Sequence, residues 1–524
     1  MSVETAFAGR ASIQPGRLPL ETIERNFADL HPPLSGFEAR VASERCLFCY
    51  DAPCVAACPT GIDIPRFIRE ISTGNALPAA KTILEANIMG GMCARVCPTE
   101  TLCEEACVRM ESEGKPVQIG LLQRHATDAL FASGKQIFSR AAPTGCKIAV
   151  VGAGPAGLAC AHALARLGHD VTVLEAREKA GGLNEYGIAA YKALDEFAAR
   201  EVAYILGVGG IRVEHGKLGR DVSLAHLRQT HDAVFLGLGL GAVNALGIAH
   251  GAASGVEDAI AFIAWLRQAR DKSTLPVGRR VVVIGGGMTA VDMATQARRL
   301  GAEEVTIVYR RDARAMKASA YEQAVAQKDG VLLRHWLRPK SLIAPHGFVQ
   351  AVEFAYVRDD GGALQDTGET LTLPCDQLFL AIGQALVAGD LGEGTLLLEG
   401  GRIKVDAERR TSLANIWAGG DCIAGGSDLT GAAGEDGKQA ARSSHAAFAG
   451  ACPWPISAPR SAASSRQIRS GSPPRRRPTR PTMSCAPSRR AGAAWCGRPW
   501  ARTARRWSMS MARAMARSMG QTGG

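Results

Sequence analysis

The chain has 524 residues, of which 46% are apolar and 5% aromatic, so it can bury the cores of several domains. Its formal net charge of +11 would favour a nucleic-acid-binding protein, but the basic residues are unevenly distributed. Residues 451–524 contain 15 Arg and no Lys, Asp or Glu, and the first 450 residues hold 46 basic against 50 acidic residues. The composition of the main part therefore argues against nucleic acid as a partner.

The beginning of the chain has no secretory pattern, and no apolar run reaches the roughly 18–20 residues needed to span a bilayer. We therefore expect a cytoplasmic protein with no membrane partner. Fifteen cysteines in a reducing compartment indicate metal or redox chemistry rather than a disulfide framework.

Residues 1–145 are predicted to form a helical domain around a cysteine-rich centre, with helices near 65–71 and 79–86. Eight cysteines within 62 residues, with two Cys-Pro steps, are typical of ligands to two 4Fe–4S clusters, and each run can contribute to both clusters. Zinc sites favour paired C-x2-C knuckles, which these spacings fit poorly. The runs are Cys46-x2-Cys49-x4-Cys54-x3-Cys58-Pro59 and Cys93-x3-Cys97-Pro98-x4-Cys103-x3-Cys107.

An α/β pattern begins at Lys147, with a strand at 148–151, a glycine-rich turn, a helix, and a second strand that ends at Glu175. In such a turn the glycines permit a tight bend, a close approach to a pyrophosphate, and close packing of helix on strand. The helix amino terminus then faces the phosphates, and Glu175 is placed to bind ribose hydroxyls. The turn is Gly152-Ala-Gly154-Pro-Ala-Gly157.

The same unit recurs about 130 residues later, with a strand at 281–284, the turn Gly285-Gly-Gly287-Met-Thr-Ala290, and a second strand at 305–309. This second strand ends in Arg310-Arg311-Asp312, where arginine can neutralise a 2′-phosphate and so favours NADPH. Asp312 could still admit NADH, and the arginines could instead be a solvated strand end.

Two such units imply a bound flavin dinucleotide and an exchangeable nicotinamide, that is, FAD with NADPH or NADH. Two further glycine motifs support the flavin: Gly181-Gly182-Leu183 lets backbone lie close to a ligand, and a strand at 416–418 leads to Gly420 and Asp421. The expected fold is α/β, with a helical iron–sulfur domain, two Rossmann-like domains and a disordered tail. The expected bounds are 1–145 for the helical domain, 146–275 with 385–450 for the FAD domain, 276–384 for the NAD(P)H domain, and 451–524 for the tail.

The Arg-, Pro- and Ser-rich tail admits three interpretations: a basic segment for nucleic acid or membrane, a disordered segment, or an out-of-frame translation. Four of the chain's seven tryptophans and no lysine fall in it, which favours the last of these.

Together these residues resemble the dihydropyrimidine dehydrogenase family over about residues 40–450, and the related small subunit of glutamate synthase shares the cysteine spacing and both Rossmann units. The closer match is to the pyrimidine enzyme, through Cys49-Tyr-Asp-Ala-Pro-Cys54, Cys58-Pro-Thr-Gly-Ile-Asp-Ile64 and Gly91-Met-Cys93-Ala-Arg-Val-Cys97-Pro-Thr99. In many bacteria the matching half is a separate flavoprotein subunit.

The resemblance implies particular ligands. It assigns one cluster to Cys46, Cys49, Cys54 and Cys107, and the other to Cys58, Cys97, Cys103 and the unusual ligand Gln123, with Cys93 as a spare. It implies FAD contacts at Glu175, Gly182, Leu183, Lys192 and Asp421. It implies NAD(P)H contacts at Arg310, Arg311, Lys317, Ala381, Ile382 and Gly383.

The resemblance also implies a function: an electron-transfer subunit that moves hydride between NAD(P)H and FAD, then single electrons through the clusters to a partner subunit with FMN and iron–sulfur centres. Pyrimidine reduction, or the reverse oxidation of dihydropyrimidines, would occur on that partner. No side chain is needed as a general acid or base, so no catalytic residue is expected. The alternatives are a glutamate synthase small subunit, a ferredoxin:NADP oxidoreductase, or a redox-responsive nucleic-acid-binding protein.

Overall fold

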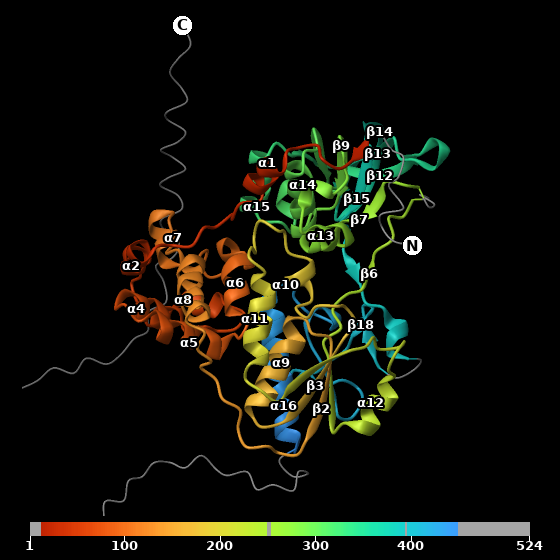
Figure 1. Ribbon diagram of the computed structural model, residues 1–524. Coiled ribbons are helices and arrows are strands. Elements are labelled where there is room, and N and C mark those ends of the chain that lie inside the picture. Colours follow the sequence, from red (N-terminus) through yellow and green to blue (C-terminus); the bar gives the residue numbers. More distant parts are fainter. Residues whose placement is uncertain (1–11, 249–252, 393–395, 449–524) are drawn as a thin grey trace, which may run out of the picture. The chain divides into compact units, whose positions relative to one another are not determined.

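Two parallel sheets and a group of short helices make up the part of the chain that the computed structural model describes, residues 12–248, 253–392 and 396–448 (Figure 1). The Arg-rich tail lies outside these residues. No helix in the described part is both long enough and apolar enough to cross a bilayer.

The helical group confirms the expected helical iron–sulfur region before residue 145, and both anticipated helices are present. A capping box formed by Ser35 and Glu38 begins α2, the first helix of the group. Asp63 caps α4, where its side chain accepts a hydrogen bond from the backbone N–H of Arg66. Apolar residues at helical spacing, such as Ile64, Phe67 and Ile71, are buried in the middle of the group. The helices are α2 (Gly36–Glu44), α3 (Pro53–Ala57), α4 (Ile64–Ser72), α5 (Ala76–Ala86), α6 (Gly90–Val96), α7 (Val108–Glu113) and α8 (Ile119–Ser133).

The first sheet has five parallel strands in the order β19-β5-β2-β3-β4. Its central strand is apolar at four consecutive positions because helices cover both faces of a parallel sheet. Its strands are β2 (Lys147–Val151), β3 (Asp170–Glu175), β4 (Ile211–His215), β5 (Ala233–Leu236) and β19 (Ile416–Ala418). Its helices are α9 (Pro155–Arg166), α10 (Leu183–Tyr186), α11 (Phe197–Leu206), α12 (Leu224–Thr230) and α16 (Thr430–Phe448).

The second sheet repeats this order as β7-β15-β9-β10-β11, again all parallel, which confirms the internal repeat. Its strands are β7 (Val256–Asp258), β9 (Arg280–Ile284), β10 (Glu304–Val308), β11 (Leu332–Arg334) and β15 (Gln377–Leu380). Its helices are α13 (Ala259–Gln268), α14 (Met288–Arg299) and α15 (Ala320–Lys328). The structure adds an antiparallel sheet that the sequence did not predict, formed by β12 (Leu337–Ile343), β13 (Ala351–Asp360) and β14 (Ala363–Pro374).

Two chain segments connect the Rossmann units. Each contains a short strand, β6 (Ala242–Val243) in one and β16 (Gln384–Ala385) in the other, and these two strands pair with each other. The boundary near residue 276 needs correction. β7 and α13 precede it, yet β7 pairs with β15 and α13 packs into the core of the second unit. An apolar helix beside a boundary fits either core, so its own sequence cannot decide which sheet it covers.

The beginning of the described chain also belongs with the second unit. β1 (Ile13–Gln14) pairs with β8 (Val277–Gly278), and Ile23 of α1 (Leu20–Asn26) is buried in the core of that unit. β1 and α1 were expected in the helical iron–sulfur domain, but they pack on the second Rossmann unit.

Candidate cofactor sites

The first glycine-rich turn lies between β2 and α9. Gly152 has φ +98°, and a Cβ atom there would lie 2.3 Å from the carbonyl oxygen of Gly237, so only glycine fits. A Cβ atom on Gly182 would lie 2.7 Å from the Cα atom of Gly154, so the two predicted glycine segments lie directly against each other. Leu183 begins α10 immediately after them. These segments form a bare backbone cradle that fits a pyrophosphate at the start of α9.

Glu175 ends β3 beside this turn and is buried. One carboxylate oxygen accepts a hydrogen bond from the backbone N–H of Ala153 at 2.8 Å, and the other accepts one from Arg177 N–H at 2.8 Å. Both bonds fix the carboxylate at the edge of the cradle. Each oxygen has a second lone pair, so the donor chemistry fits a ribose hydroxyl.

Gly420 and Asp421 follow β19, at the edge of the same sheet. Burial and the nearby Asp428 raise the pKa of Asp421 to about 6. The backbone N–H of Gly420 donates to Asp436 of α16 at 2.9 Å, and Arg409 pairs with that same carboxylate at 2.7 Å. Asp436 therefore holds the Gly-Gly-Asp turn in place, a role that no sequence motif indicated.

The second glycine-rich turn repeats the first in detail. A Cβ atom on Gly285 would lie 2.3 Å from the carbonyl oxygen of Ala381, just as one on Gly152 would meet Gly237. Gly287 caps α14, and Ala290 is fully buried where the helix crosses the sheet. The predicted turn Ala381–Ile382–Gly383 thus lies next to Gly285, and the two units offer equivalent dinucleotide cradles.

The predicted NAD(P)H side chains lie beyond the end of β10. Arg310 is exposed, whereas Arg311 is partly buried and its Nε–H has no hydrogen-bond partner among the described residues. A partly buried guanidinium group whose Nε–H has no partner fits an anionic ligand such as a phosphate. Lys317 is exposed and lies 3.6 Å from the carboxylate of Asp428, in the flavin unit.

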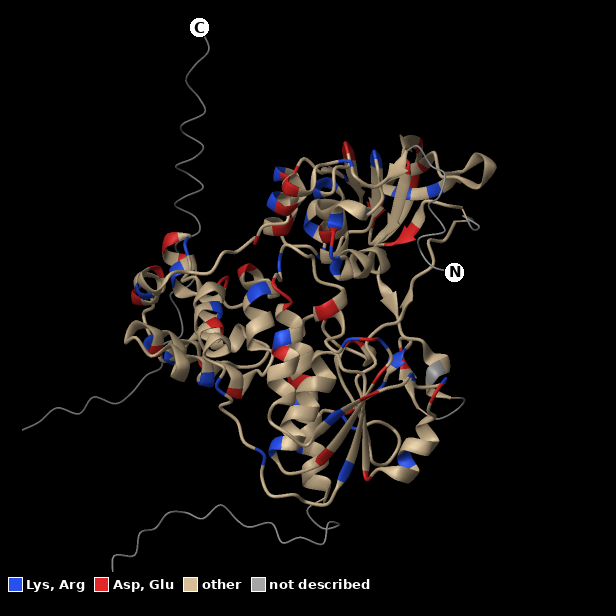
Figure 2. Ribbon diagram, viewed as in Figure 1, with Lys and Arg blue, Asp and Glu red and all other residues tan. Residues whose placement is uncertain are grey.

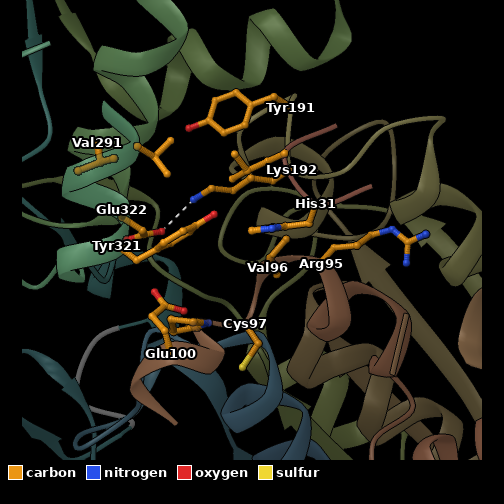
Figure 3. Close-up of a pocket in the computed structure, with 13 residues that line it drawn as sticks. His31, Arg95, Val96, Cys97, Glu100, Tyr191, Lys192, Val291, Tyr321 and Glu322 are labelled. Carbon is orange, nitrogen blue, oxygen red and sulfur yellow. Dashed lines mark hydrogen bonds and ion pairs between the residues drawn. The ribbon is translucent and has the colours of Figure 1, made fainter. Parts of the chain in front are cut away.

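Lys192 has a different environment from the other predicted FAD residues. Its Nζ atom lies 2.7 Å from Asp292 of α14 and 2.9 Å from Glu322 of α15, and Figure 3 shows the pair with Glu322. Despite burial, these carboxylates raise the pKa of Lys192. The side chain therefore ties the flavin unit to the nicotinamide unit through two buried ion pairs. The second Glu322 oxygen is buried without a hydrogen-bond partner in the described part of the chain.

A cavity adjoins this ion cluster where segments of all three units meet (Figure 3). Ser319, which caps α15, donates to Glu100 at 2.5 Å, and Glu100 lies between Cys97 and Cys103 in the second cysteine run. His31 stacks on Tyr321 across the same cavity, with ring centroids 5.8 Å apart. The nicotinamide unit therefore contacts the helical group as well as the flavin unit.

The cysteines of the first predicted set interact with one another. Burial, and then the neighbouring thiols of Cys49 and Cys107, raise the pKa of Cys46. Burial, Cys107 and Cys46 raise the pKa of Cys54 to about 12. All four thiols are free and partly exposed. Their grouping fits one four-cysteine cluster site.

The second set lies deeper. Burial raises the pKa of Cys103, and the thiols of Cys97 and Cys58 raise it further. Cys93 is buried beside Cys58 and Cys103 and accepts a hydrogen bond from Asn87 at 3.1 Å. Cys93 thus lies where it could fill the fourth position, which the resemblance assigns to Gln123.

Gln123 is buried on α8, and its amide Nε2 donates to the carbonyl oxygen of Gly90 at 2.7 Å. That bond leaves the carbonyl oxygen of the side chain as the atom able to bind iron. Among the described residues, no three His, Cys, Asp or Glu side chains are gathered around a single metal-ion position. In a 4Fe–4S cluster each thiolate binds a different iron, so the ligands stand further apart.

Cys93, beside the second set, lies against the flavin unit. A Cβ atom on Gly431, at the start of α16, would lie 3.6 Å from the Cys93 sulfur. Thr430 donates to Asn184 of α10 at 2.8 Å, and Asn184 in turn lies near Met89 in the loop before α6. The cysteine group and the flavin cradle are therefore directly packed.

Comparison with known proteins agrees with this construction. Residues 23–135 match the family model for the dihydropyrimidine dehydrogenase domain II with a 4Fe–4S cluster, and residues 146–437 match pyridine nucleotide-disulphide oxidoreductase. The first match covers the helical group and reaches back into α1, and the second spans both Rossmann units.

Individual relatives match over most of the chain. NAD-dependent dihydropyrimidine dehydrogenase subunit PreT of Escherichia coli O157:H7 is 34% identical over 431 residues, 82% of this chain and 99% of the relative. The glutamate synthase [NADPH] small chain of Escherichia coli K12 is 33% identical over 457 residues, 82% of this chain and 95% of the relative. The chain therefore belongs to the family of NAD(P)-linked flavin and iron–sulfur oxidoreductases that contains PreT and the glutamate synthase small chain.

Proposed function

We propose that this oxidoreductase is the electron-transfer subunit of an NAD(P)-dependent dihydropyrimidine dehydrogenase in the cytoplasm. It would interconvert uracil or thymine with their 5,6-dihydro forms only together with an FMN- and iron–sulfur-containing partner subunit. When bound, FAD exchanges hydride with NAD(P)H, and two 4Fe–4S clusters carry single electrons between the flavin and the partner. The names of the relatives support a partner, since one is a subunit and another a small chain.

The observation that carries the proposal is the packing of α6, the helix that ends directly before Cys97, on the flavin unit. Cys93 lies against Gly431, and α6, which carries Cys93, is held by the flavin unit as well. Electron transfer slows steeply with distance, so a chain that relays electrons must bring these two sites together. The partly exposed first set then lies on the path toward a partner.

We assign the proposed ligands as follows. Cys46, Cys49, Cys54 and Cys107 hold one cluster, and Cys58, Cys97, Cys103 and Gln123 hold the other. FAD is held by Gly152, Gly154, Gly157, Glu175, Gly182, Leu183, Lys192, Gly420 and Asp421. NADPH or NADH is held by Gly285, Gly287, Ala290, Arg310, Arg311, Lys317, Ala381, Ile382 and Gly383.

The chain's own residues position these groups. The α9 and α14 amino termini attract the two pyrophosphates, and the Lys192 ion pairs hold one unit in register with the other. Hydride transfer needs the two reacting rings in contact at a defined angle, so this register governs its rate. Arg310 and Arg311 supply positive charge for a 2′-phosphate, which favours NADPH.

A glutamate synthase small chain is the second candidate, because that relative is 33% identical over a nearly equal length. The two functions differ in the partner and its substrate. The purified chain should be combined in turn with the FMN-containing pyrimidine subunit of the same cell and with the glutamate synthase large chain. Dihydrouracil-dependent NAD(P) reduction by the first pair supports our proposal. Glutamine-dependent NADPH oxidation by the second pair alone would replace it.

A further inference from the structure

Tyr309 occupies, in the second Rossmann unit, the position that Glu175 occupies in the first. In the first unit the backbone N–H of Gly152 donates to the carbonyl oxygen of the residue before Glu175, at 2.8 Å. In the second unit the backbone N–H of Gly285 donates to the carbonyl oxygen of the residue before Tyr309, at 3.1 Å. An acid at this position hydrogen-bonds the ribose 2′-hydroxyl in Rossmann folds. The second unit therefore has an aromatic side chain where a ribose-binding acid would stand.

The Tyr309 ring lies directly against the second glycine-rich turn. A Cβ atom on Gly286, the middle residue between Gly285 and Gly287, would lie 2.5 Å from two carbon atoms of this ring. The G-x-G fingerprint leaves this middle position open, and the first turn has Ala153 there. Glycine at position 286 therefore accommodates the ring of Tyr309.

The hydroxyl of Tyr309 fixes the loop that joins β10 to α15, residues 309–319. It donates a hydrogen bond to the carbonyl oxygen of Ala315 at 2.8 Å. The side chain of Asp312, the only acidic residue of the loop, accepts a hydrogen bond from the backbone N–H of Ala315 at 2.8 Å. Asp312 thus stabilises a turn within the loop itself. The same loop carries the predicted nicotinamide contacts Arg310, Arg311 and Lys317.

Gln323 holds this loop from α15. Its side chain is buried, and its Nε2 atom donates to the carbonyl oxygens of Ala318 at 3.0 Å and Ala313 at 3.2 Å. The backbone N–H of Ala318 in turn donates to the carbonyl oxygen of Gly286 at 3.1 Å. The loop is thereby fixed to α15 and to the glycine-rich turn by the chain's own bonds, which lowers the cost of ordering it when a nucleotide binds.

The charges of the second unit make this placement important. Basic and acidic residues are interspersed over its helices and strands (Figure 2). Recognition of a phosphate there therefore depends on where individual cations are held, rather than on one broad basic field. Arg311 is such a cation, because its buried Nε–H has no hydrogen-bond partner among the described residues.

We propose that Tyr309 is a specificity-determining residue, through which the second cradle selects the nicotinamide dinucleotide that carries a 2′-phosphate. Its ring replaces the acid that would bind an unphosphorylated ribose. Its hydroxyl, together with Gln323, positions Arg310 and Arg311 for the phosphate. Tyr309 and Gln323 act through these arginines and are positioning residues. The inference rests on the proposed function only in taking the second cradle as the nicotinamide site.

The test compares Tyr309→Phe and Gln323→Met with Tyr204→Phe. Tyr309→Phe keeps the ring and removes the hydroxyl, and Gln323→Met removes the amide that holds the loop. Tyr204→Phe is the matched control, because it removes a hydroxyl of α11 in the flavin unit that accepts a hydrogen bond from the backbone N–H of Ile137 at 3.3 Å. Each full-length chain is purified anaerobically with its cofactors, and isothermal titration calorimetry measures the Kd for NADP+ and for NAD+. The FAD content of each preparation reports whether the flavin unit is intact.

We expect Tyr309→Phe to raise the Kd for NADP+ about fivefold, the effect of one lost hydrogen bond, and Gln323→Met to raise it at least as much. The Kd for NAD+ should stay within about twofold in both variants, because NAD+ has no 2′-phosphate for the arginines to bind. Tyr204→Phe should change neither Kd, and the FAD content should be the same in all chains.

An equal rise in Kd for both nucleotides would overturn the proposal, because the loop would then support the whole cradle without selecting a phosphate. Unchanged Kd values in both loop variants, or a wild-type chain that binds NAD+ more tightly than NADP+, would overturn it as well. A selective loss of NADP+ binding in the variants, together with a wild-type chain that passes no electrons to the pyrimidine subunit, would refute the proposed function and leave this inference standing.

Discussion

The carboxylate of Glu201 accepts hydrogen bonds from the backbone N–H groups of Gly91 at 2.8 Å and Met92 at 3.0 Å. Glu201 lies on α11 of the flavin unit, whereas Gly91 lies in the first turn of α6, which carries Cys93 and precedes Cys97. A Cβ atom on Gly91 would lie 2.9 Å from this carboxylate and 2.6 Å from the Phe197 ring, so glycine is required for the contact. Two units that hold different cofactors are thus joined at a buried bond.

Replacing Glu201 should therefore loosen the iron–sulfur helix. In Glu201→Ala the two N–H groups lose their acceptor in a buried site, which costs about 1–3 kcal/mol for each group. Glu201→Gln keeps an oxygen acceptor of the same size and should lose less. Urea unfolding measures both variants. If Glu201→Ala and Glu201→Gln lost equal stability, this role of the carboxylate oxygen would be contradicted.

The buried ion cluster at Lys192 gives a second prediction. Lys192→Met leaves Asp292 and Glu322 buried without their cation, and breaking such a pair typically costs about 3–5 kcal/mol. We also expect slower reduction of the flavin by NAD(P)H in stopped-flow measurements, because the two units lose their register. Lys404→Met is the matched control, since its pair with Glu399 is exposed and should matter by under about 1 kcal/mol. Equal losses in the two variants would refute the cluster's importance.

Acid should destabilise the flavin unit through His169. Burial, and then the neighbouring His445, lower the pKa of His169 to about 4. The Nε2 atom of His169 lies 2.9 Å from the Nδ1 atom of His445. The unfolded chain, with an ordinary histidine pKa near 6.5, therefore binds more protons between pH 6.5 and 4. Stability is full above pH 6.5 and falls as pH drops through this window, by about 3 kcal/mol from this group.

Thermal unfolding from pH 7.5 to 4.5 should show this loss, and His169→Gln should reduce it. His226→Gln, which changes an exposed histidine of α12, is the control and should leave the pH dependence unaltered. If His169→Gln follows the wild-type curve over the whole range, another group governs the acid response.

Iron content distinguishes the two candidates for the fourth ligand of the second cluster, Gln123 and Cys93. If Gln123 is the fourth ligand, Cys93→Ser should keep about eight irons per chain, while Gln123→Leu and the control Cys97→Ser should each fall toward four. Cys93→Ser keeps a small polar group that Asn87 can still bind. Anaerobic iron and sulfide quantitation measures all three variants. Loss of iron in Cys93→Ser with retention in Gln123→Leu would reverse the assignment.

The local parts of this structure could be predicted from the sequence because their causes are local. Both glycine-rich turns, the strands around them and Glu175 lie where the spacing placed them. Each is set by a short run of residues and the sterics of one turn. The repeat of these units predicted two Rossmann-like units, whereas the order of their strands came from the structure.

The remaining parts depend on contacts between distant segments. Glu201 and Asp436 carry no motif, and their function exists only because Gly91 and Gly420 lie opposite them. Lys192 could be picked out by resemblance, but its pairing with Asp292 could not. α13 reads as an apolar helix, and only tertiary packing assigns it to the second sheet. A local sequence pattern does not predict which distant residue a side chain will contact.

Anaerobic reduction of the purified chain tests the central claim, electron relay from nicotinamide through flavin to clusters, most directly. The account predicts one FAD and about eight irons per chain, with the visible absorbance of both flavin and clusters bleached by NADPH or NADH. The more effective nicotinamide would also show whether Arg310 and Arg311 act on a 2′-phosphate. Zinc in place of iron, or a bound flavin that neither nicotinamide reduces, would contradict the account.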